Sequence, residues 1–114
     1  MEESTRQKKV GRLLQRELGT YFQQHTSDYA KGGMITVTAV RVSPDLSIAK
    51  TYLSVFAVAD KQAIVDSVRE QSWQVRKFLG GQVRNQLRIV PELMFYLDDS
   101  LDVIERIDDL LKDQ

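Results

Sequence analysis

The first apolar positions of the chain recur every three or four residues, which is the spacing of one face of an α-helix. These positions are Val10, Leu13, Leu14, Leu18, Tyr21 and Phe22. Ser4 or Thr5 is placed to cap the start of this helix, and the polar residues 23–28 are expected to end it. The opening part of the sequence therefore predicts an amphipathic helix.

Two short segments after this helix have the composition of β-strands. Residues 34–42 follow the turn signal Gly32-Gly33 and are rich in β-branched side chains, which favour a strand. Ser43-Pro44-Asp45 interrupts the pattern, because proline presets a turn and aspartate bonds to nearby backbone. Residues 48–56 predict a second strand. A connection this short between neighbouring strands favours an antiparallel hairpin.

A second apolar stripe follows Asp60, a residue type that caps helices well. Its members are Ala63, Ile64, Val68, Val75, Leu79, Val83 and Leu87. One helix of about thirty residues is long for so small a domain, so we expect a break. Either Gln71-Ser72-Trp73 or Gly80-Gly81 is the place, because glycine weakens a helix by about 1 kcal/mol relative to alanine. Pro91 is expected to end the helical region.

The remaining residues predict one strand and one helix. Residues 93–97 are apolar enough for a strand at the centre of the sheet. Asp98-Asp99-Ser100 is then expected to cap a last amphipathic helix, with Leu101, Ile104, Ile107, Leu110 and Leu111 on one face. The order is helix-strand-strand-helix-helix-strand plus a terminal helix. We therefore expect residues 1–114 to form one domain, an α+β sandwich with the helices on one face of a three-stranded sheet.

The composition narrows the class of protein. The chain has 114 residues, no cysteine and one histidine, which excludes disulfides and thiolate metal sites. His25 stands alone in a polar stretch, so it anchors neither a catalytic triad nor a histidine-rich metal site and is expected to be a plain surface residue. No apolar run approaches the roughly 20 residues that span a bilayer, and the N-terminus does not have the pattern of a signal peptide. We expect a cytoplasmic monomer with no enzymatic activity, cofactor, metal, small-molecule substrate or membrane contact.

The charges are unevenly distributed along the chain, although the 16 basic and 16 acidic side chains sum to zero. Residues 6–16 and 69–88 are basic, whereas the residues after Pro91 are mainly acidic. The electrostatic potential of a charge decays within about 8–10 Å at physiological salt. Binding of a charged partner therefore depends on local patches of charge and not on the net charge of the chain. The candidate phosphate-binding residues are Lys8, Lys9, Arg12, Arg16, Arg76, Lys77, Arg84 and Arg88, with Arg41 and Lys50 as weaker candidates from the hairpin.

Two residues beside these cations have two interpretations each. Gly81 shares a predicted helical face with Lys77, Arg84 and Arg88, where the absence of a side chain lets an RNA backbone approach closely. The alternative is ordinary helix–helix packing at Gly80-Gly81. Trp73 is the best candidate for stacking on an unpaired base, and it is equally well suited to be a core residue between helices.

Three stretches of the sequence together resemble the ribosome-binding factor A family of bacterial small-subunit maturation factors. The first is the basic opening helix from Val10 to Leu18. The second is residues 37–50, Val-Thr-Ala-Val-Arg-Val-Ser-Pro-Asp-Leu-Ser-Ile-Ala-Lys, which are similar to the hairpin of that family. The third is residues 87–95, Leu-Arg-Ile-Val-Pro-Glu-Leu-Met-Phe, followed by Asp98 and Ser100. The resemblance extends from about residue 6 to residue 111.

The resemblance implies a type II KH fold without catalysis or cofactor. It also implies binding to the small (30S) ribosomal subunit and its 16S rRNA during late maturation and rRNA processing, chiefly in the cold. In that family a small-residue helix break replaces the GxxG loop of other KH domains, and the matching stretch here is Gln71-Ser72-Trp73. The leading hypothesis is a non-enzymatic RNA- and ribosome-binding module. The alternative is a protein–protein adaptor that docks through its acidic C-terminal helix.

Overall fold

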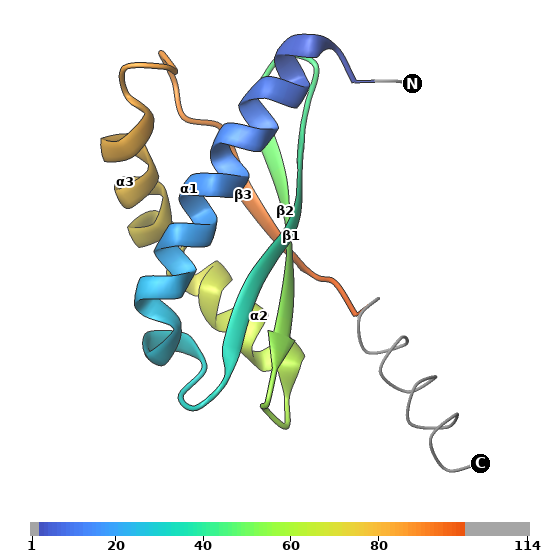
Figure 1. The fold of residues 1–114 in the computed structure, drawn as a ribbon, viewed down its shortest axis with the longest axis vertical. Helices are drawn as coiled ribbons and strands as arrows, with labels where there is room; N and C mark the ends of the chain where they lie inside the picture. Colours follow the sequence, from blue (N-terminus) through green and yellow to red (C-terminus); the bar gives the residue numbers. More distant parts are fainter. Residues whose placement is uncertain (1–2, 100–114) are drawn as a thin grey trace, which may run out of the picture.

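The computed structural model describes residues 3–99, which follow the predicted order of elements (Figure 1). The helices are α1 (Thr5–Tyr29), α2 (Lys61–Glu70) and α3 (Ser72–Val83). The strands are β1 (Met34–Val42), β2 (Ile48–Phe56) and β3 (Glu92–Leu97). These helices cover one face of the sheet, so the expected α+β sandwich is confirmed. The predicted terminal helix after Asp99 lies outside the described residues.

The start of α1 is fixed by two residues that bond to each other. Ser4 is the N-cap, and its hydroxyl accepts a hydrogen bond of 3.1 Å from the backbone N–H of Gln7. The side-chain oxygen of Gln7 accepts a bond of 2.7 Å from the backbone N–H of Ser4, which completes a capping box. The side-chain amide of Gln7 also donates a bond of 2.8 Å to the carbonyl of Val42. This buried contact ties the start of α1 to the end of β1.

The end of α1 lies beyond the place that the sequence predicts. The polar residues 23–28 do not end the helix, which continues to Tyr29 with non-helical backbone angles at His25 (φ −117°, ψ 16°). Tyr29 is buried, and its hydroxyl is hydrogen-bonded to the hydroxyl of Tyr21. Its ring also lies 6.0 Å from the ring of Phe22, centroid to centroid. Aromatic packing of this last turn outweighs the low helix propensity of the polar residues before it.

The sheet has the order β1-β2-β3, with β2 antiparallel to β1 and parallel to β3. The predicted hairpin is therefore confirmed, whereas the prediction that the third strand lies at the sheet centre is wrong. Because β1 occupies one edge of β2, the chain returns through α2 and α3 to pair with the free edge. β3 is an edge strand, and its alternate residues Leu93 and Phe95 are buried in the core.

The break in the second apolar stripe lies at Gln71, the first of the two expected places. Gln71 has φ −108° and ψ 21°, and it is both the C-cap of α2 and the N-cap of α3. Its N–H donates to the carbonyl oxygens of Ser67 and Val68, and its carbonyl accepts from Gln74. A break at Gly80-Gly81 is wrong, since both glycines lie inside α3.

Candidate nucleic-acid interface

The basic residues of α1 lie on the side of the helix that faces away from the sheet. Lys8, Arg12 and Arg16 are four residues apart and therefore form one row along the helix, with Lys9 beside it. All four are exposed, whereas the apolar face of α1 is buried in the core. The guanidinium of Arg16 lies 3.4 Å from the carboxylate of Glu17, and an exposed pair of this kind is worth little. The row therefore remains available to an anion.

The second group of cations lies on α3 and on the segment that follows it. Arg76, Lys77 and Gly81 are exposed on the helix. The prediction that Arg84 and Arg88 continue the same helical face is wrong, because α3 ends at Val83. Arg84 is the C-cap and Arg88 lies in the connection to β3.

The connection between α3 and β3 is not helical, and it packs against the core. Leu87 and Val90 pack against the core, and Pro91 disfavours helical backbone at Val90. The Nη2 of Arg76 donates a hydrogen bond of 2.8 Å to the carbonyl of Val90. Arg76 therefore has a structural partner, while Lys77, Arg84 and Arg88 carry the exposed charge of this group.

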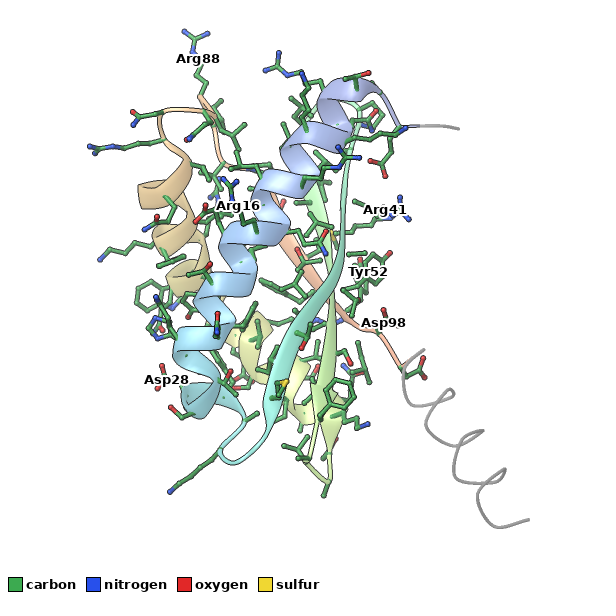
Figure 2. All side chains as sticks on the ribbon, viewed as in Figure 1. Arg16, Asp28, Arg41, Tyr52, Arg88 and Asp98 are labelled. Atoms are coloured by element: carbon green, nitrogen blue, oxygen red, sulfur yellow. The ribbon has the colours of Figure 1, made fainter. Side chains whose placement is uncertain are left out.

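One basic residue that sequence reasoning did not select is Arg6. Arg6 and Arg88 line the same hollow of about 240 Å³, next to Asp45 in the β1–β2 turn. Hydrogen bonds from Ser47 and Ser43 hold the pKa of Asp45 below its usual value. In Figure 2, Arg88 lies at the end of the molecule where α1 begins. Arg6 belongs to the basic run in the first turns of α1, but only the folded chain reveals that it lines the same hollow as Arg88.

The two hairpin candidates lie on the other side of the sheet. Arg41 and Lys50 are exposed and are Cα partners in the β1–β2 register. Figure 2 shows Arg41 projecting from the side of the sheet opposite the helices, whereas Arg16 lies on the helical side. The guanidinium of Arg41 is 3.0 Å from the carboxylate of Glu3. The structure therefore brings the cations of α1, α3 and the α3–β3 connection to the helical side and separates Arg41 and Lys50 from them.

The aromatic residues near α3 differ in exposure. The side chain of Trp73 is 63% exposed, so the interpretation as a core residue is wrong. His25 is not a plain surface residue, because its ring stacks on Tyr21 at 4.5 Å and its Nδ1 lies 3.1 Å from the carboxylate of Asp28. Burial, followed by the hydrogen bond with Tyr21, raises the pKa of Tyr29 above that of an ordinary tyrosine.

Within residues 3–99 no group of three or more histidine or acidic side chains is placed to hold a metal ion. The helices of this part of the chain include none that is long and apolar enough to cross a membrane.

The element order, the one-sided helical layer and the basic surface define a small KH-like domain, a class of fold that binds nucleic acid in many proteins. A family model described as Ribosome-binding factor A matches residues 6–111, and the chain belongs to this family. The predicted family and the KH-like fold are therefore confirmed.

Relatives and solved structures agree with this assignment. The chain is 43% identical to a ribosome-binding factor A of Cytophaga hutchinsonii over 96% of this chain and 82% of the relative. It is 40% identical to one of Christiangramia forsetii over 98% and 86% of the two chains. The crystal structure of ribosome-binding factor A from Thermus thermophilus superposes with a TM-score of 0.67 at 22% identity, covering 80% and 94%. A homology model of the Thermus thermophilus factor, fitted into the cryo-EM map of a 30S–RbfA complex, gives a TM-score of 0.62 at 24% identity, covering 76% and 89%.

Proposed function

We propose that this protein is a non-enzymatic ribosome-assembly factor of the cytoplasm that binds the small ribosomal subunit and its 16S rRNA. It acts as a monomer during late maturation and rRNA processing, including growth in the cold, and needs no cofactor or small-molecule substrate. Membership of the ribosome-binding factor A family supports the proposal, as does the 30S complex of the Thermus thermophilus factor.

The observation that carries the proposal is the grouping of cations on the helical side of the molecule. The row of α1, Lys77 of α3, and Arg84 and Arg88 of the following segment are exposed. Both α1 and α3 lie on the helical side of the sheet (Figure 1). Lysine and arginine position a protein on RNA through charge and hydrogen bonds to phosphate, which does not depend on base sequence. Residues 6–16 and 71–91, which carry these cations, contain no acidic side chain, so the zero net charge of the whole chain does not prevent binding.

Co-sedimentation with purified 30S subunits, compared with 50S subunits and assembled ribosomes, tests the proposal. We expect binding to 30S subunits, with log K falling linearly against log salt by about 0.7–0.9 per phosphate neutralised. The triple variant Lys77→Ala/Arg84→Ala/Arg88→Ala should fold normally, since these side chains lie outside the core. Its affinity should be lower by about tenfold or more, and its salt slope should be smaller by about 2–3.

The matched control is the double variant Arg41→Ala/Lys50→Ala on the opposite side of the sheet. It also removes exposed cations, but we expect it to co-sediment almost like the wild type. Equal binding by the wild type and the triple variant at moderate salt would contradict the proposed interface. The adaptor hypothesis concerns the acidic C-terminal segment, which lies outside the described residues, and it remains a prediction.

A further inference from the structure

A groove of about 590 Å³ lies between the second half of α1 and α3. The lining residues that matter for its chemistry are Tyr21, His25, Trp73, Lys77, Phe78 and Gly81. The two helices are joined along it by the rings of Tyr21 and Phe78, whose centroids are 5.2 Å apart. The ring of His25 stacks on Tyr21, with 26° between the two planes. Packed aromatic rings therefore give the groove a fixed, apolar wall.

Trp73 stands at the edge of this groove with most of its surface in solvent. It is 63% exposed, and within residues 3–99 the other exposed large hydrophobic side chains are aliphatic: Met34, Ile89 and Met94. Trp73 and Lys77 also line a second hollow, of about 380 Å³, together with Arg76 and Val90. An indole bordered by two hollows has its surface open to a flat ligand. Stacking on a base would remove that apolar surface from water.

Lys77 follows Trp73 by four residues, so the two side chains lie on the same face of α3. Within residues 3–99 no ion pair occupies the ammonium group of Lys77. The acidic lining residue Asp28 is instead paired with His25, at 3.1 Å. A phosphate is therefore attracted to the Lys77 side of the groove and not to the Asp28 side. The exposed amides of Gln74 and Gln82 lie on the lining and supply donors and acceptors for a base edge.

We propose that this groove binds one unpaired nucleotide of RNA, with its base stacked on Trp73 and its phosphate at Lys77. The proposal rests on the proposed function and adds to it the kind of RNA that α3 recognises. The volume lies within the range of small-ligand sites, about 300–1,000 Å³. Unpaired bases can be splayed out and stacked on aromatic side chains, whereas the bases of an A-form duplex keep their faces covered by their neighbours. The groove should therefore select single-stranded over double-stranded RNA.

Trp73 is the one tryptophan of the chain, so its fluorescence reports directly on the proposed contact. We expect a single-stranded RNA pentanucleotide of mixed sequence to quench this fluorescence in a saturable manner. A blunt RNA duplex of the same composition should quench it much less at equal nucleotide concentration. Equal quenching by duplex and single strand would overturn the proposal.

Variants separate stacking from electrostatic attraction. Binding of the labelled pentanucleotide, measured by anisotropy, should weaken about tenfold in Trp73→Ala and less than about threefold in Trp73→Phe, which keeps an aromatic face. The salt slope of Trp73→Ala should equal that of the wild type, because an indole contacts no phosphate. In Lys77→Ala the slope should fall by about 0.7. Thermal unfolding of each variant shows whether the fold is intact, which we expect because both side chains are exposed.

The failure of this proposal is distinguishable from the failure of the proposed function. Wild-type pentanucleotide affinity in Trp73→Ala would overturn base stacking, while normal co-sedimentation of the same variant with 30S subunits would leave ribosome binding in place. Absence of 30S binding by the wild-type protein would contradict the proposed function itself. Gly81→Ala provides a further test. A methyl group at the groove lining should weaken binding of the pentanucleotide and leave the salt slope unchanged.

Discussion

The guanidinium of Arg76 and the backbone carbonyl of Val90 are joined by a hydrogen bond of 2.8 Å, which links α3 to the segment that leads into β3. Arg84 and Arg88 belong to the chain between these two points. Arg76 is therefore expected to act indirectly in the proposed RNA binding, by fixing the segment that presents two other cations.

Replacement of Arg76 by methionine should show that Arg76 stabilises the fold through its hydrogen bond to Val90, apart from any effect of its positive charge. The variant keeps an unbranched side chain but loses the donor to Val90, and we expect a loss of about 1 kcal/mol in the free energy of unfolding by urea. Arg84→Met is the matched control, because Arg84 is exposed at the C-cap and should have almost no effect on stability. Equal destabilisation by both substitutions would contradict the role assigned to the Arg76–Val90 bond.

Alanine substitution at two glycines should have opposite effects on stability. A Cβ at Gly33 would lie 2.6 Å from the carbonyl oxygen of Phe56 and 2.8 Å from a methyl of Val58, so Gly33→Ala should destabilise by about 1–3 kcal/mol. A Cβ at Gly81 would have no neighbouring atom within 4 Å, and Gly81 lies inside an α-helix. Gly81→Ala should therefore stabilise by about 0.5–1 kcal/mol while weakening 30S binding. A destabilised Gly81→Ala with a proportionate loss of binding would show that Gly81 is structural.

Gln7 should matter more for stability than its partner in the capping box. Ser4→Ala removes one cap and should cost about 1 kcal/mol. Gln7→Ala removes the reciprocal cap and also leaves the carbonyl of Val42 without its buried donor, so it should cost about 2–3 kcal/mol. Chemical denaturation of the two variants under the same conditions compares them. A smaller loss in Gln7→Ala than in Ser4→Ala would contradict this order.

The β1–β2 turn should contribute a pH-dependent part of the stability. The lowered pKa of Asp45 means that the charged form is favoured by folding, through hydrogen bonds from Ser47 and Ser43. The contribution of Asp45 to the free energy of unfolding is fully present above its pKa in the unfolded chain, about 3.9. This contribution is lost as the pH falls through the lower pKa of the folded protein. Asp45→Asn should therefore flatten the decrease in melting temperature below about pH 4. An unchanged acid profile in the variant would show that other carboxyl groups cause the decrease.

Much of the fold follows from local sequence patterns, whereas the order of the strands does not. The apolar periods and the Pro44 turn predict every element between Thr5 and Leu97. They do not say which edge of β2 receives β3, because that depends on the path of α2 and α3 across the sheet. The continuation of α1 through His25 was also beyond local reasoning, since it accompanies the burial of Tyr29 in the core, which is a tertiary contact.

The candidate site was predictable in residue type but not in arrangement. The basic runs identified the cations of α1 and α3, yet only the tertiary fold shows that Arg6 and Arg88 line the same hollow. The separation of Arg41 from the other cations was predictable from the sequence. Arg41 lies between the buried Val40 and Val42, and the alternation of side chains along a strand places it on the face away from the core. The role of Arg76 could not be predicted, since a bond to a distant carbonyl leaves no trace in composition.

The parallel pairing of β2 with β3 has a consequence for the order of folding. The β1–β2 hairpin joins residues that are near in sequence, whereas the pairing of Ile48 with Glu92 closes a loop that contains both α2 and α3. Because closing the longer loop costs more chain entropy, β3 is expected to dock late and to open first in native-state hydrogen exchange. Each opening of this edge strand would strain or release the bond between Arg76 and Val90. If the cations of this segment bind RNA as proposed, the lifetime of the complex should depend on the stability of β3, although β3 carries none of the candidate RNA-binding residues.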